Sequence, residues 1–170
     1  MPTLSNLDIK KDLNKINPVI SNTIKFALIM IIPSAVGLSI ISAPIISVIY
    51  EHGMFSELNT LNVSKVLIAF STGLPAFVII KIYLPIFYSL GDTKTPLFYS
   101  LISIALNLIL AILLFNSLGV VGIALSTYIS SWINFVLLVL GSEKYKIKIS
   151  SKRLKMDLFK IILSTAFMAL

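Results

Sequence analysis

The stretch KVLIAFSTGLPAFVIIKIYLPIFYSLGDTKTP, residues 65–96, decides the fold of this chain. Its apolar part, Val66 to Leu90, is long enough to cross a bilayer, since a helical crossing takes about 20 residues. A polar turn at 91–96 follows, and a second apolar run then begins. Two such runs joined by a tight turn predict an all-α, polytopic membrane helix bundle.

The composition supports a membrane protein over a water-soluble one. The chain has 170 residues, of which 57% are hydrophobic and 12% charged, whereas a soluble domain has about 25% charged residues. Its mean hydropathy is +0.98. The absence of cysteine excludes disulfides and thiolate metal sites, and His52 is the single histidine. No catalytic or cofactor-binding motif appears, so we expect no enzyme, metal or cofactor.

The remaining apolar runs extend the same pattern along the chain. We expect four complete transmembrane helices and the start of a fifth, at about 26–50, 66–90, 97–115, 120–140 and, truncated, 158–170. The polar segments between them include two that we expect in the cytoplasm, an N-terminal segment at 1–25 and a basic loop at 141–157.

The basic residues predict the orientation of the bundle. The net charge is +7, but the lysines and arginine lie in short segments between apolar runs, which fits membrane loops better than nucleic-acid binding. If the N-terminal segment is cytoplasmic, 12 of the 14 basic residues fall on that side. Only Lys65 lies on the other side, and Lys81 lies within a span. Because cytoplasmic loops are rich in lysine and arginine, we predict a cytoplasmic N-terminus.

Lys81 is the one cation inside a predicted span. A lysine near mid-membrane costs about 2.5–3.5 kcal/mol on insertion scales. At 1.5 Å per residue it lies roughly 13 Å from Leu90, close to mid-depth. Lys81 therefore faces a polar cavity, or it is paired with another side chain or snorkels to the headgroups.

Other polar and small residues within the spans predict helix packing. Asn107 lies in the middle of its span and requires a hydrogen-bond partner on another helix, since lipid supplies none. Gly122 and Ser126 begin a small-residue stripe at four-residue spacing, which allows a neighbouring helix to approach closely. Before the third span, Thr93 or Thr95 is expected to cap the helix with its side-chain oxygen.

Several stretches together carry a resemblance to a known family. They are PSAVGLSIISAPII at 33–46, YEHGMF at 50–55 and GLPAFVIIKIYLPIFYSLGDTKTP at 73–96. In order and spacing they resemble the MurJ (MviN) family of lipid II flippases. The opening PTLS at 2–5 is similar to the loop before that family's ninth helix.

The resemblance implies an inner-membrane protein of the multidrug/oligosaccharidyl-lipid/polysaccharide exporter superfamily, with about fourteen helices. Members move the undecaprenyl-pyrophosphate-linked peptidoglycan precursor to the periplasmic leaflet for cell-wall biogenesis and cell shape. Two six-helix lobes alternate access around a cationic cavity, and two more helices form a groove for the lipid tail. By position, this chain covers the ninth to twelfth helices and the start of the thirteenth. The implied partners are lipid II, membrane lipids and a separately encoded N-terminal half.

The resemblance also implies roles for individual residues. Lys81 matches a lysine position in the tenth helix and is carried over as a cavity cation, facing either the pyrophosphate or a counter-carboxylate. Asp92 and Lys94 match the cytoplasmic turn, which serves as a helix junction or gate. The key cavity arginines of the family belong to earlier helices that this chain lacks.

Two alternatives to a lipid II flippase stay open from the sequence. One is another member of the superfamily, such as a polysaccharide-lipid flippase or a drug exporter. The other is a non-transporting remnant of a truncated gene that inserts into the membrane and carries nothing.

Overall fold

The computed structural model describes residues 13–53, 55–145, 147 and 151–168. Within these ranges the chain forms helices and no strands. The helices are α1 Leu13–Ile40, α2 Ser42–Tyr50, α3 Glu57–Ser89, α4 Lys94–Leu118, α5 Val120–Glu143 and α6 Ser151–Met168. The polytopic, all-α bundle predicted from the sequence is therefore confirmed.

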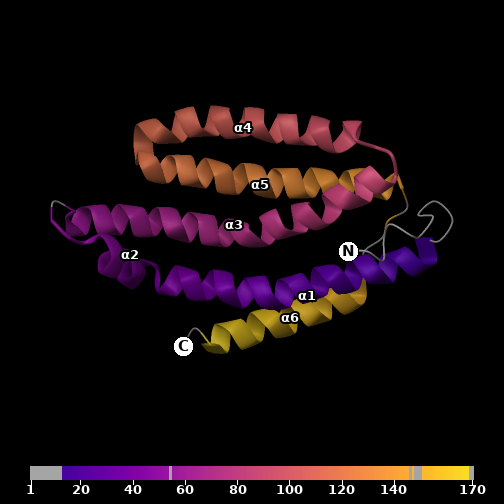
Figure 1. Ribbon diagram of the computed structural model, residues 1–170, viewed down its shortest axis with the longest axis horizontal. Helices are drawn as coiled ribbons and strands as arrows, with labels where there is room; N and C mark the ends of the chain where they lie inside the picture. Colours follow the sequence, from indigo (N-terminus) through magenta and orange to yellow (C-terminus); the bar gives the residue numbers. More distant parts are fainter. Residues whose placement is uncertain (1–12, 54, 146, 148–150, 169–170) are drawn as a thin grey trace.

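The helices lie side by side with their long axes in a similar direction (Figure 1). In order across the bundle they are α4, α5, α3, α1 and α6, while α2 continues the line of α1. α5 packs on both α4 and α3, whereas α3 and α4 barely touch. Among the described residues, four helices are long and apolar enough to cross a membrane: Asn17–Ile40, Glu57–Ser89, Lys94–Leu118 and Val120–Glu143.

The largest buried cluster ties α1, α3 and α5 together near the turn that joins α3 to α4. Its α3 members include Tyr83 and Phe87, which are almost fully buried. Ile20 and Ile24 of α1 and Leu138 of α5 complete most of the contact. α4 contributes only Tyr99, at the edge of this cluster, so its attachment to the bundle depends mainly on α5.

The first predicted span differs from the structure at both ends. The sequence predicted a polar segment to residue 25 and one helix over 26–50, but α1 begins at Leu13 and ends at Ile40. Pro44 has no N–H with which to bond the Ile40 carbonyl, so the helix is interrupted there. The chain restarts as α2, in which Pro44 lies in the first turn and needs no helical donor.

The other helices are longer than their apolar runs. α3 begins at Glu57, inside the expected polar connection, and α5 ends at Glu143, inside the expected basic loop. α6 begins at Ser151, seven residues before the expected apolar segment at 158. Hydropathy marks only the part of a helix that suits lipid, and helices continue into water wherever the side chains permit.

α1 and α6 are joined by an ion pair as well as by packing. The Lys25 amine lies 2.8 Å from a carboxylate oxygen of Asp157, and both side chains are partly exposed. Such a pair contributes little to stability, about 0–1 kcal/mol, because water screens it. It nevertheless fixes which face of α6 meets α1.

Two glycines allow α4 and α5 to form a tight hairpin. Gly119 joins the helices with a φ of +58°, a conformation that side chains with a Cβ adopt rarely. A Cβ on Gly122 would lie 2.5 Å from the backbone oxygen of Leu114. The backbones of the two helices therefore approach too closely here for any residue but glycine.

This contact predicts that Gly122→Ala destabilises the hairpin. Overpacking of a well-packed contact costs about 1–3 kcal/mol, and backbone atoms cannot move aside as a side chain can. Thermal unfolding in detergent, followed by circular dichroism, measures the loss. Gly37→Ala is the control, because its Cβ would meet nothing closer than 3.9 Å. Equal unfolding temperatures for the two variants would contradict the interpretation.

Candidate functional site

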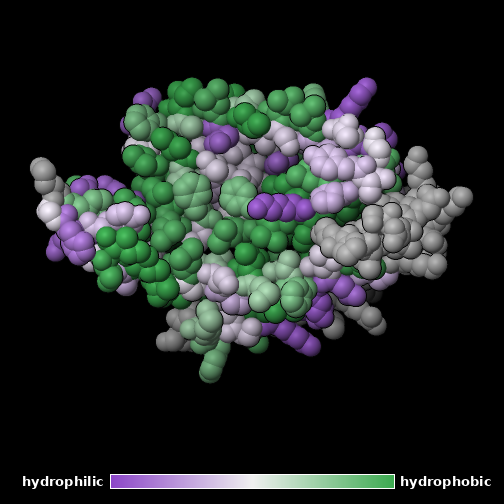
Figure 2. All heavy atoms as spheres, in the orientation of Figure 1, coloured by the Kyte–Doolittle hydropathy of each residue, from purple (hydrophilic) through white to green (hydrophobic). Residues whose placement is uncertain are grey.

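A polar groove lies between α4 and α5. Its volume is about 270 Å³. It is lined by Ser100, Ser103, Ile104 and Asn107 of α4 and by Thr127, Ser130, Ser131 and Asn134 of α5. Figure 2 shows white and purple side chains over the middle of these two helices, between green apolar surfaces. We call this feature the hydroxyl groove.

The hydroxyl groove extends from near the middle of α4 and α5 toward the Asp92 turn, since Ser100 lies six residues after the start of α4 and Asn134 nine before the end of α5. Asn107 is 13 residues after the start of α4 and 11 before its end, or roughly 20 and 17 Å at 1.5 Å per residue. Apolar side chains beyond the groove are exposed, including Leu97 and Phe98 toward one end and Ile112 and Leu113 toward the other. The groove therefore begins near mid-membrane, and exposed apolar side chains of α4 lie beyond it in both directions.

Asn107 and Ser126 form a hydrogen bond between α4 and α5. The Ser126 hydroxyl donates to the side-chain oxygen of Asn107 at 2.8 Å, and Ser126 itself is fully buried. The sequence predicted a partner on another helix for Asn107, and Ser126 stands in that position. Gly122, one turn earlier on α5, makes the close approach that brings the two side chains together.

The hydroxyls of the groove are oriented toward their own helices. Ser103 donates to the Tyr99 carbonyl at 2.9 Å, and Ser130 donates to the Ser126 carbonyl at 2.7 Å. Ser131 and Thr127 donate in the same way to carbonyls one turn earlier. Since a hydroxyl has one proton and two lone pairs, these side chains keep only acceptor capacity for other partners.

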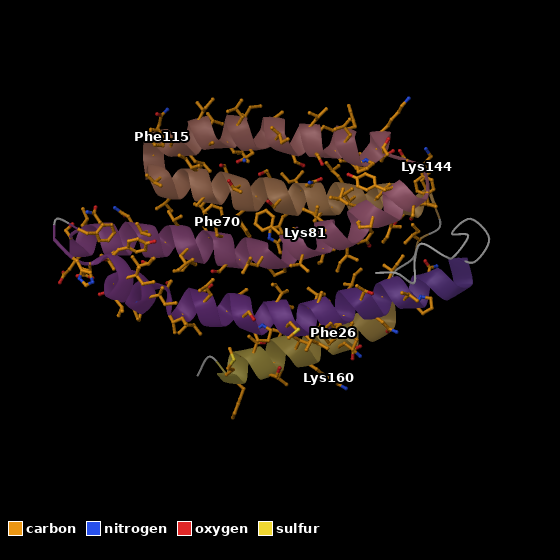
Figure 3. The ribbon with its side chains drawn as sticks, viewed as in Figure 1. Phe26, Phe70, Lys81, Phe115, Lys144 and Lys160 are labelled. Carbon is orange, nitrogen blue, oxygen red and sulfur yellow. The ribbon has the colours of Figure 1, made fainter. Side chains whose placement is uncertain are left out.

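Lys81 lies within the span of α3, eight residues or roughly 12 Å before its end at Ser89, and its side chain is exposed. Figure 3 labels it between α3 and α5. Among the residues that the structure describes, Lys81 has no ion-pair partner. The groove lining does not include it. Its cavity role remains a prediction.

Asp92 joins three segments at the turn between α3 and α4. Its carboxylate accepts a hydrogen bond from the backbone N–H of Thr95 at 3.0 Å and another from the Tyr145 hydroxyl. Tyr145 follows α5, and its ring packs edge-on against Phe87 of α3 with centroids 6.0 Å apart. Lys94, in contrast, is exposed at the first position of α4. The carboxylate therefore connects the ends of α3, α4 and α5.

These contacts hold the pKa of the Asp92 carboxyl at about 2, below its ordinary 3.8. The largest cause is hydrogen bonding from the Thr95 side chain, followed by the bonds from Tyr145 and from the Thr95 backbone, and the Lys144 charge adds to them. Accepting hydrogen bonds favours the charged carboxylate. The same contact raises the pKa of the Tyr145 hydroxyl, because its proton is held by Asp92.

Some of these residues were not found by sequence reasoning. The expected cap of α4 by Thr93 or Thr95 is wrong: Thr93 makes no capping bond, and the Asp92 carboxylate takes that position. The contact of Tyr145 gave no signal in the sequence, since Tyr145 lies 53 residues from Asp92. The groove did give a signal, because serine, threonine and asparagine recur every three or four residues on two adjacent spans.

The described residues contain no cluster of three or more His, Asp or Glu that could hold a metal ion. What they contain is a bundle of membrane-spanning helices, a polar groove at mid-depth and an exposed lysine within a span. This arrangement defines a polytopic helical membrane protein.

Comparison with known proteins gives the family. A sequence profile described as Lipid II flippase MurJ matches residues 1–170. The chain is 38% identical over 171 residues to a probable lipid II flippase MurJ of Rickettsia prowazekii, covering 100% of this chain and 34% of that protein. It is 34% identical over 160 residues to the lipid II flippase MurJ of Thermosipho africanus, covering 94% and 32%. The chain belongs to the MurJ family.

A solved structure agrees with the sequence matches. It is named Lipid II flippase MurJ, inward closed conformation, and its fold matches this chain with a TM-score of 0.81 at 33% sequence identity. The match covers 98% of this chain and 34% of that protein. The chain thus spans about a third of the length of the relatives it matches.

The Asp92 junction predicts a pH-dependent stability. Because the folded-state pKa is lowered, the carboxylate's stabilisation is fully present above about pH 4 and is lost as the pH falls toward 2. Asp92→Asn should therefore unfold at a lower temperature than the parent at pH 7. The difference in unfolding temperature between the parent and Asp92→Asn should become smaller below pH 4 and vanish near pH 2.

Thermal unfolding in detergent at pH 7, 5, 4, 3 and 2 checks this. Glu143→Gln removes an exposed negative charge in the same region and controls for the general loss of a carboxylate. Tyr145→Phe should reproduce part of the Asp92→Asn effect, because it removes one of the donors. If the unfolding temperatures of the parent and Asp92→Asn differ by the same amount at every pH, the charge of the Asp92 carboxylate does not stabilise the turn.

Proposed function

We propose that this chain is part of a lipid II flippase in the bacterial inner membrane. As such it is a transporter and not an enzyme, and it moves the undecaprenyl-pyrophosphate-linked peptidoglycan precursor between leaflets. The observation that carries the proposal is the family match over the whole chain. The fold agreement with a solved member, at a TM-score of 0.81, supports it.

A flippase must move the polar headgroup of its lipid across the hydrocarbon core of the membrane. A pyrophosphate with sugars and a peptide cannot cross hydrocarbon, because each polar group would lose its hydrogen bonds to water. A hydrated, cationic path through the protein lowers that cost while the polyprenyl tail stays in lipid. Two lobes that open to one side in turn would let the headgroup pass without opening a pore.

In this proposal Lys81 contributes a positive charge to the path. Its exposure within the span of α3 supports the role, because a lysine facing lipid there would be costly. Asp92, with Lys94 beside it, serves as a junction that keeps the ends of α3, α4 and α5 together when the lobe moves. Its bonds to Thr95 and Tyr145 support that part.

The orientation and the partner are parts of the same proposal. The N-terminal segment, the Asp92 turn and the segment after α5 lie in the cytoplasm, as the distribution of basic residues indicates. The family's cavity arginines belong to helices outside these 170 residues, and the transport path needs those helices as well. The relatives are about three times as long as this chain, which supports a need for further helices.

Complementation tests the function. The resident lipid II flippase is depleted in a host strain, and the chain is supplied alone or with the segment of the Rickettsia relative that precedes the matched region. Labelled lipid II on the outer leaflet is then measured. Restoration with both parts supports the flippase. Absence of restoration, with both parts shown to be inserted, favours the non-transporting remnant or an exporter of another substrate.

Within the restored pair, Lys81→Ala should lower lipid II on the outer leaflet by about tenfold or more. A hydrogen bond to a charged group contributes about 1.5–3 kcal/mol, and about 1.4 kcal/mol corresponds to tenfold. Lys81→Arg should keep most of the activity, since it keeps the charge. Lys65→Ala is the matched control, an exposed lysine of α3 near its other end. Normal flipping by Lys81→Ala at normal abundance would exclude the cavity role.

A further inference from the structure

The turn of α3 that holds Lys81 also holds a proline, four residues further along the helix. Pro85 has no backbone N–H, so it cannot donate to the carbonyl of the residue one turn earlier, which is Lys81. Residues four apart lie on one side of a helix, about 40° apart around its axis. The missing bond therefore falls on the same side of α3 as the Lys81 side chain, which is exposed.

α3 is bent near this turn. Its last turns slant toward the ends of α4 and α5 (Figure 1), and Figure 3 labels Lys81 close to where the slant begins. A proline ring presses on the carbonyl one turn earlier, so the helix opens on the side of the proline and bends away from it. The bend carries the end of α3 toward α5, where the almost fully buried Phe87 contacts the ring of Tyr145.

The described part of α3 offers no substitute donor for this carbonyl. Hydroxyl side chains can replace a helical donor lost at a proline within the membrane. Here the nearest ones serve other carbonyls, since Thr72 donates to Ala69 and Ser89 to Ile86. The side chain of Tyr83 is fully buried, on the packed side of α3. The carbonyl of Lys81 therefore keeps its acceptor capacity on the exposed side of the helix.

An ammonium and an open carbonyl on one side of one turn are chemically complementary. A lysine ammonium has three donors and no acceptor, whereas a backbone carbonyl only accepts. The headgroup of the proposed substrate carries both counterparts. The anionic oxygens of its pyrophosphate suit the ammonium, and the hydroxyl and amide N–H groups of its sugars and peptide suit the carbonyl.

We propose that Pro85 is a positioning residue for the transport path, because it leaves the Lys81 carbonyl free to accept a hydrogen bond from a hydroxyl or amide N–H of the headgroup. Residue 81 then holds the headgroup twice, through its ammonium and through its carbonyl. Pro85 acts through this carbonyl and does not itself touch the substrate. The inference rests on the proposed function and deepens it.

Pro85→Ala tests the inference, because alanine restores the N–H that closes the helical bond to Lys81. In the restored pair used for Lys81→Ala, we expect lipid II on the outer leaflet to fall about 2- to 12-fold, the range for one neutral hydrogen bond. The same variant should unfold in detergent at an equal or higher temperature than the parent, because alanine suits a helix interior better than proline. A purely structural proline would instead give a loss of stability together with the loss of flipping.

Two further variants separate the missing donor from other effects of the proline. Pro75→Ala is the matched control, since it makes the same change in the same helix but restores a bond to Ser71, which is fully buried. We expect normal flipping from it. An aliphatic α-hydroxy acid at position 85 puts an ester oxygen in place of the N–H, so it lacks the donor as proline does and also lacks the ring. We expect this variant to flip as the parent does, and it decides the matter if Pro85→Ala fails to insert.

Several outcomes would overturn the inference. Normal flipping by Pro85→Ala at normal abundance, with Lys81→Ala impaired, would overturn it and leave the proposed function standing. An inserted α-hydroxy acid variant that has lost flipping would show that the missing N–H is not what matters. An equal loss from Pro75→Ala would reduce the effect to the shape of α3. If the parent pair itself restores no flipping, the proposed function fails and this inference fails with it.

Discussion

Hydrocarbon offers no hydrogen bonds, and this constraint shapes every polar group in the membrane-spanning part of the bundle. Many of the described serines and threonines within the spans donate to a carbonyl of their own helix, as Ser71 does to Leu67 and Thr72 to Ala69. Ser126 does more, because its proton is shared between the Ile123 carbonyl and Asn107 of the neighbouring helix. These hydroxyls are thus satisfied within their own helix, and one of them also holds one helix against another.

α5 is the helix on which the arrangement depends. It contacts both α4 and α3, which hardly touch each other, and it can do so because its side chains toward α4 are small. Gly122 admits the α4 backbone, and Gly141 admits the ring of Tyr99, whose nearest carbon would lie 2.6 Å from an added Cβ. The hydroxyl groove lies between these two glycines along α5. The same small residues therefore account for both the close packing and the polar opening.

The fold could be predicted because the bilayer leaves few choices. Apolar runs of about 20 residues predicted the number and order of the spans. The polar side chain of Asn107 within a span predicted a hydrogen bond to another helix. The ends of the helices could not be predicted, since a helix such as α3 continues to Glu57 where lipid no longer selects for apolar side chains. The Asp92–Tyr145 contact was also out of reach, because it joins residues 53 apart and depends on how α5 ends. The substrate that we propose rests on the family and not on any pattern in the residues alone.

The central claim is that the chain crosses the membrane four times, with the Asp92 turn and the segment after α5 on the same side. The natural absence of cysteine makes this directly measurable. Single cysteines at Ser56, Thr93, Ser117 and Lys144 can be treated in intact cells with a membrane-impermeant thiol reagent. The account predicts labelling at 56 and 117 in intact cells, and labelling at 93 and 144 only after the inner membrane is permeabilised. Labelling of positions 93 and 117 from the same side would contradict it, because α4 would then not span the membrane.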